Sequence, residues 1–167
     1  MKNIQIQPLL VVGLLLIPGV LGATESTVYE EISGHYEAIR LALLGDSLDG
    51  VDEHAAAIHE LASDLVSDFS AGKAGVAGTE ADKLETALQN IATAASRLAD
   101  DSDLAAARDD FFRLTKPMAQ YRKLAGTTGT VVAYCSMAQK AWIQPEGELG
   151  NPYMGQKMPR CGEIVGE

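Results

Sequence analysis

Two short sulfur-containing motifs near the C-terminal end are the residues of this chain best suited to chemistry. One is Cys135-x-Met137 and the other is Met158-x-x-Cys161. Thiolate and thioether sulfurs are soft, polarisable donors that favour Cu(I) or a similar ion over Mg²⁺ or Ca²⁺, and zinc sites seldom use methionine. These donor types therefore predict a site for Cu(I) or a similar soft ion, with Cys135, Met137, Met158 and Cys161 as its ligands.

The same residues also have a structural interpretation. A pair of cysteines in an exported protein is expected first to form a disulfide. A bond between Cys135 and Cys161 would close the tail as an Ω-like loop and stabilise the protein by roughly 3 kcal/mol, because it restricts the unfolded chain. Met137 and Met158 can equally fill space in a core that is poor in aromatic residues. Ligand pair and disulfide both remain open at this point.

A histidine is a possible further ligand. At about 100° per helical residue, His54 lies about 40° from Ile58, within the apolar face of a predicted helix. His59 lies at the flank of that face, so the two cannot share an ion as an i, i+4 pair can, and His35 lies at the edge of the preceding helix's apolar face. A lone inward histidine is more often a hydrogen-bonded core residue. His54 becomes a ligand if the tail folds over the second helix.

The sequence gives no sign of covalent catalysis. It contains no phosphate-binding glycine loop, no His-Glu-x-x-His motif and no serine in a nucleophile elbow. We therefore expect that the protein is not an enzyme. Its formal net charge of -10 repels nucleic acid and anionic lipid headgroups, so neither is an expected partner.

The first residues have the features of a signal peptide. Lys2 precedes a nearly uninterrupted apolar run over residues 8–21, and the small residues Gly22 and Ala23 follow it. The run is short and rich in Pro and Gly for a membrane-spanning helix, and no cysteine lies near the cleavage point to carry a lipid. We expect residues 1–23 to be a signal peptide, and the protein to be periplasmic or otherwise exported, with no stable membrane anchor after cleavage.

Helices must position the sulfur motifs. The chain has 167 residues, of which 47% are hydrophobic and only 5% aromatic, a mixture that suits closely packed helices in one domain. Apolar residues recur at helical spacing in four stretches, and residues 24–125 are predicted to form an antiparallel four-helix bundle. The predicted boundaries are Gly45-Asp46 after the first helix, Val51 to Phe69 for the second, a capping box at Thr79 to Asp82 before the third, and Asp100 to Asp103 before the fourth, whose apolar face includes Met118.

The pattern changes at Gly126. Residues 130–134 are β-branched and aromatic and predict a short strand, whereas everything after Cys135 is punctuated by Pro and Gly and is expected to be irregular. Residues 126–167 are thus predicted to be a Cys/Met-rich segment packed on the bundle as part of the same domain. We expect a cross-link or a metal to hold it, Trp142 to anchor it or to shield bound Cu(I), and Asn151 to cap a turn.

These residues resemble a known family. The matching stretches are Tyr134-Cys135-Ser136-Met137-Ala138, Trp142-Ile143 and Asn151-Pro152-Tyr153-Met154-Gly155-x-x-Met158-x-x-Cys161-Gly162. They are similar to motifs of exported helical domains that occur alone or fused to periplasmic adaptor (membrane fusion) subunits of copper and silver efflux pumps. Two positions depart from the family pattern. Ser136 replaces a proline, and Met154 replaces an aromatic residue, where it either adds a sulfur or fills the same hydrophobic space.

The resemblance implies that the protein handles copper or a related heavy metal outside the cytoplasm. The leading hypothesis is a metal-binding protein that buffers Cu(I) or Ag(I), or delivers it to an adaptor of a heavy-metal efflux pump. The alternative is an envelope interaction domain that is stapled by a disulfide and holds no metal.

Overall fold

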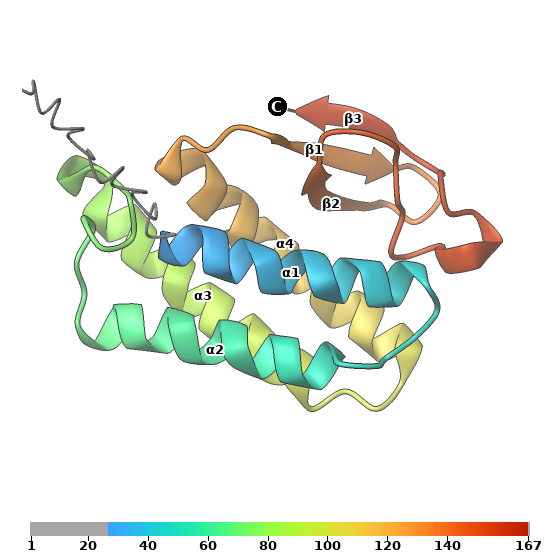
Figure 1. Ribbon diagram of the computed structural model, residues 1–167, viewed down its shortest axis with the longest axis horizontal. Coiled ribbons are helices and arrows are strands. Elements are labelled where there is room, and N and C mark those ends of the chain that lie inside the picture. The colour runs from blue at the N-terminus through green and yellow to red at the C-terminus, as the bar shows by residue number, and fades with distance from the viewer. Residues whose placement is uncertain (1–26, 167) are drawn as a thin grey trace, which may run out of the picture.

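The computed structural model describes residues 27–166, which form four α-helices followed by a small sheet (Figure 1). The protein is therefore mainly helical, as predicted. The predicted signal peptide, residues 1–23, lies outside the described residues. The elements are α1 (Val28–Leu44), α2 (Val51–Ser67), η1 (Gly78–Glu80), α3 (Ala81–Ala99), α4 (Leu104–Ala125), β1 (Thr130–Cys135), β2 (Lys140–Pro145), η2 (Gly155–Lys157) and β3 (Glu163–Gly166).

Local hydrogen bonds fix most of the helix ends. Thr27 and Glu30 form a capping box at the start of α1, in which each side chain accepts a bond from the other's backbone N–H. The carboxylate of Asp103 accepts bonds from the first N–H groups of α4. The capping box predicted at Thr79 is wrong, because Thr79 lies in the 3₁₀ turn η1 and α3 begins at Ala81 without a side-chain cap.

The four helices bury one shared apolar core. α1 packs on α2, α2 on α3, and α3 on α4, and α4 also contacts α1. Met118 of α4 is buried in this core, as predicted. The largest fully buried side chains are Trp142, Tyr121, Phe111, Ile32, Ile39, Leu43, Ile58, Leu84, Leu88, Ile91, Leu98 and Leu114. Within residues 27–166, no helix combines the length and the apolar character needed to cross a membrane.

The sheet covers α1 and α4 on the side away from α2 and α3 (Figure 1). Its strand order is β2-β1-β3, with both pairs antiparallel. The predicted strand at residues 130–134 is confirmed and extends to Cys135. The expectation that everything after Cys135 is irregular is wrong, since β2 and β3 form there. Their pairing with β1 supplies the order that their own Pro- and Gly-rich sequence does not.

Candidate functional site: a cysteine pair at the end of strand β1

Pairing of β1 with β3 brings the two cysteines together. Cys135 ends β1 and is fully buried, while Cys161 lies half-buried just before β3. The register places Tyr134 opposite Glu163, so the neighbouring Cys135 and Cys161 meet although they are 26 residues apart in sequence. Their Sγ atoms are 2.7 Å apart and both cysteines are free thiols. The predicted convergence of these two sulfurs is confirmed.

The two thiols differ in their affinity for a proton. Burial raises the pKa of Cys135, but hydrogen bonds from Cys161, from the backbone N–H groups of Ala138 and Met137 and from Asn151 outweigh burial and leave that pKa below its ordinary value. The pKa of Cys161 is raised, chiefly because its thiol donates a hydrogen bond to Cys135, and further by burial and by the charge on Cys135. Cys135 is therefore the thiol of the pair that ionises more readily, and Cys161 is the one that donates a hydrogen bond to it.

The two predicted methionine ligands flank the pair along the chain. Met137 lies in the turn between β1 and β2 and is 64% exposed, so it does not fill the core. Met158 is half-buried outside the core, and its carbonyl accepts a 3.1 Å hydrogen bond from the N–H of Cys161. Met154, by contrast, packs against the core, in keeping with its space-filling interpretation. Both thioethers in the predicted ligand set thus lie outside the packed interior.

His54 is not brought to the cysteines. Its Nδ1 lies 2.9 Å from Nδ1 of His35 on α1, and the two ring centroids are 5.2 Å apart. The condition for ligation was that the tail fold over the second helix, but it folds over α1 and α4 (Figure 1). Among residues 27–166, no three side chains of the His, Cys, Asp and Glu types gather in a group that could hold a metal ion. His54 is accordingly a contact between α1 and α2.

Asn151 positions Cys161 through a turn. Its side chain is fully buried, and Oδ1 accepts bonds from the backbone N–H groups of Tyr153, at 2.8 Å, and Met154, at 3.0 Å. The predicted turn capped by Asn151 is confirmed. Its Nδ2 also donates a 2.6 Å hydrogen bond to the carbonyl of Cys161, which sequence reasoning missed. One amide therefore shapes the turn and places the second cysteine.

Two arginines dock this turn on the helices. Arg40 of α1 donates from Nη1 to the carbonyl of Gly150 at 2.6 Å, and Arg108 of α4 donates from Nε to the carbonyl of Pro152 at 2.7 Å. Arg40 is buried and paired with Glu37. Sequence reasoning missed both arginines. The available signal was the position of Arg40 on the apolar face of its helix, where a charged residue needs a partner.

Aromatic packing completes the attachment. Trp142 is fully buried, and its Nε1 donates a 2.8 Å bond to Oε1 of Gln144, which also accepts the N–H of Gly150. A Cβ on Gly162 would lie 2.7 Å from the indole, so a glycine after Cys161 permits the close approach. The prediction that Trp142 anchors the tail is confirmed. We expected a cross-link or a metal to hold the tail, and the structure adds buried hydrogen bonds and aromatic contacts that attach it as well.

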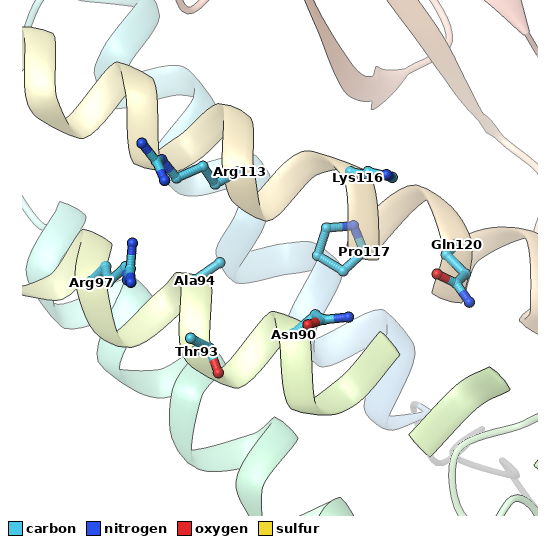
Figure 2. A pocket seen from close by; sticks show the side chains of 8 residues that line it. All are labelled: Asn90, Thr93, Ala94, Arg97, Arg113, Lys116, Pro117 and Gln120. Carbon is cyan, nitrogen blue, oxygen red and sulfur yellow. The ribbon is translucent and has the colours of Figure 1, made fainter. Parts of the chain in front are cut away.

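A second concave surface lies between α3 and α4 (Figure 2). This groove of about 350 Å³ is lined by Asn90, Thr93, Ala94, Arg97, Arg113, Lys116, Pro117 and Gln120. Figure 2 shows cationic side chains on both helices that border it. Guanidinium and ammonium groups have no lone pair to offer and repel a metal cation, so the groove is not the soft-metal site.

The cysteine pair, with its asymmetric thiols, is thus what the tertiary structure brings together, and Met137 and Met158 are near it only along the chain. Comparison of the chain with protein-family models, with curated proteins and with solved structures finds no match.

Proposed function

We propose that this chain is an exported metal-binding protein that holds Cu(I) or Ag(I) between the thiolates of Cys135 and Cys161. The observation that carries the proposal is the meeting of two cysteine sulfurs, 2.7 Å apart, from distant parts of the sequence. One thiol is already biased toward the thiolate, the form that binds metal. The other is only half-buried, which gives an ion a route into the site.

Two thiolates suit this cargo. Soft monovalent ions are satisfied by few sulfur ligands, whereas Mg²⁺ and Ca²⁺ need six or more oxygens. A metal–thiolate bond is about 2.3 Å long, so the two sulfurs must move apart to admit an ion. The half-buried Cys161 is the partner free to move, because Cys135 is packed in the core. Binding then displaces the thiol protons, so affinity rises with pH.

The thioethers of Met137 and Met158 complete the proposed site as weak, exchangeable ligands. Their position outside the core, with Met137 exposed and Met158 half-buried, supports a role in passing the ion to a partner. The resemblance of the tail to domains associated with copper and silver efflux makes a periplasmic adaptor the proposed recipient. The four helices, packed in sequence on one another, would form the antiparallel four-helix bundle that supports this site. No catalytic activity is proposed.

A second candidate function is an envelope interaction domain without metal. The same 2.7 Å contact favours it, because two thiols so close can be oxidised to a disulfide with little movement. In that state the cysteines would staple the tail and offer no ligand.

Titration of the reduced protein with Cu(I) against a competing chelator tests the leading proposal. We expect one ion per chain, a large loss of affinity in Cys135→Ser and in Cys161→Ser, and a smaller loss in Met158→Leu. Met154→Leu is the matched control, because Met154 packs against the core. The Cu(I) affinity of this variant should equal that of the unmodified protein. Unchanged affinity in the double variant Cys135→Ser, Met158→Leu would rule the site out.

Intact mass after thiol alkylation separates the two candidates. Freshly isolated protein that takes up alkylating reagent at both cysteines, and is protected by Cu(I), supports metal binding. A pair that is blocked until a reductant is added, whether or not copper is present, supports the disulfide.

A further inference from the structure

Two histidines meet between α1 and α2, apart from the cysteine pair. His35 of α1 and His54 of α2 place their Nδ1 atoms 2.9 Å apart, and both side chains are half-buried. A hydrogen bond between two neutral imidazoles uses one N–H and one lone pair, so one Nδ1 donates to the other. The pair thus consists of two nitrogen donors from different helices with a single proton between them.

The two rings meet end to end. Their centres are 5.2 Å apart. A nitrogen lies about 1.2 Å from the centre of an imidazole ring, so this separation is close to the greatest that the 2.9 Å contact permits. The two Nδ1 atoms therefore lie almost on the line that joins the ring centres. Because the lone pair of an imidazole nitrogen points straight out from the ring, each Nδ1 is directed at the other.

This end-to-end arrangement is the donor set of a linear, two-coordinate ion. Cu(I) and Ag(I) accept two ligands in line, and imidazole is a usual ligand of copper. Zn²⁺ takes four ligands, but no third side chain of the His, Cys, Asp or Glu type within residues 27–166 joins the pair in a group that could hold a metal ion. The geometry therefore favours a soft monovalent ion over Zn²⁺.

An acidic hollow between α1 and α2 lies beside the pair. His35 lines this hollow of about 410 Å³ together with the side chains of Glu31, Glu60 and Asp64. Carboxylates on the walls of a concave surface raise the local concentration of cations. The hollow therefore gives a positive ion an approach to the imidazole of His35.

We propose that His35 and His54 bind one Cu(I) or Ag(I) ion between their Nδ1 atoms, as a second metal site of this chain. A metal–nitrogen bond is about 2 Å long, so the two nitrogens must move apart by about 1 Å, which a small rotation of the half-buried rings allows. The proton that lies between them moves to Nε2 of its own ring, so that both Nδ1 atoms offer a lone pair and no proton is released.

The histidine site does not rest on metal binding by the cysteines. Two neutral imidazoles bind a soft ion more weakly than two thiolates do. A chelator strong enough to compete with the cysteines therefore removes the ion from the histidines, and a titration against it counts the cysteine site alone.

NMR of the imidazole nitrogens during titration with silver nitrate, in a chloride-free buffer, tests the proposal. In the full chain with both Cys135→Ser and Cys161→Ser, which has no thiols, we expect the Nδ1 resonances of His35 and His54 to shift together and to saturate at one ion. Both rings should then carry their proton on Nε2. His59 should not shift, because its Nδ1 is hydrogen-bonded to the carbonyl of Ala92 at 2.9 Å. The unmodified protein should show the same shifts, whatever its cysteines bind.

Matched variants of the thiol-free chain separate ligation from packing. Asparagine keeps a polar group near the position of Nδ1 but is a poor ligand for a soft ion. His35→Asn and His54→Asn should each lower the affinity for Ag(I) at least about tenfold, whereas His59→Asn should leave it unchanged. Silver that shifts neither ring, or only one of the two, would overturn the proposal, as would equal affinities in His35→Asn and its thiol-free parent.

Discussion

Cys135 and Cys161 are chemically distinct because of their neighbours. Cys135 accepts hydrogen bonds from the turn that follows β1, and Cys161 supplies a further one from its thiol. The backbone of Ala138, whose N–H lies 3.5 Å from Cys135 Sγ, takes part because the β1–β2 turn folds back over the strand end. A thiolate is therefore favoured at the buried position, where burial alone would oppose it.

This arrangement predicts the outcome of removing one thiol. Cys161→Ala deletes a donor to Cys135, so the pKa of Cys135 should rise toward its ordinary value. Cys161→Ser retains a hydroxyl donor, and its Cys135 pKa should lie between those of Cys161→Ala and the unmodified protein. The ultraviolet absorbance of the thiolate, followed as a function of pH, measures each value. A lower Cys135 pKa in Cys161→Ala would contradict the inferred direction of the hydrogen bond.

Asn151 helps to position Cys161, because its side chain donates a hydrogen bond to the carbonyl of that residue. Asn151→Ala should destabilise the protein by about 2–4 kcal/mol, because two backbone N–H groups and one carbonyl lose their partner in a buried turn. Urea unfolding measures the loss. Asn90→Ala, an exposed asparagine on α3, is the control and should change stability by less than about 0.5 kcal/mol. If Asn151→Ala and Asn90→Ala lower the free energy of unfolding equally, the hydrogen bonds of Asn151 do not stabilise the turn.

At the scale of elements, helices were predicted well and strands poorly. A helix buries a continuous face through residues three and four apart, so its apolar residues reveal it locally. The strands β2 and β3 are defined by hydrogen bonds to β1, and β3 pairs with a segment about thirty residues away. The residues of either strand alone do not predict that pairing. The third helix began two residues later than predicted, because the turn η1 takes up Thr79.

The turn η2 packs against the loop between α1 and α2. Gly155 has a φ of 53°, and a Cβ there would collide with the paired side chains of Asp46 and Arg108. Gly126 has a similar φ of 64°, but a Cβ there would meet nothing within 4 Å. Gly126→Ala should destabilise the protein by roughly 1 kcal/mol, because the added Cβ strains the backbone but meets no neighbour. Gly155→Ala should destabilise it by more, because the collision adds to the same strain. Chemical denaturation measures the free energy of unfolding of both variants. Equal losses would mean that the turn is not packed against Asp46 and Arg108.

At the scale of the whole molecule, the tail is held without a covalent link. Asn151, the two arginines and Trp142 attach it to α1 and α4, so the fold does not require the cysteines to react. This leaves the thiols available for a ligand. It also means that oxidation and metal binding act on a tail that is already in place.

Measurement of stability with and without a reductant tests whether the tail stays docked without a disulfide. A disulfide that spans 26 residues should add about 3–4 kcal/mol by restricting the unfolded chain, and should raise the melting temperature accordingly. The reduced protein should keep its tail docked, so limited proteolysis should spare residues after Gly126, as it should in the Cys135→Ser control. Rapid cleavage within the tail of the reduced protein would show that a cross-link is needed after all.

The amino-acid sequence by itself determined the four helices, the strand that ends at Cys135, and the sulfur atoms with their chemical softness. These are properties of residue type and short-range spacing. Only the tertiary structure decided which donors meet. It brought Cys135 and Cys161 together through the β1–β3 pairing, left Met137 exposed, and packed the tail on α1 and α4, while His54 contacts His35. The physical reason is that convergence of distant side chains depends on the combined hydrogen bonds and packing of the whole tail, which no single stretch of sequence contains.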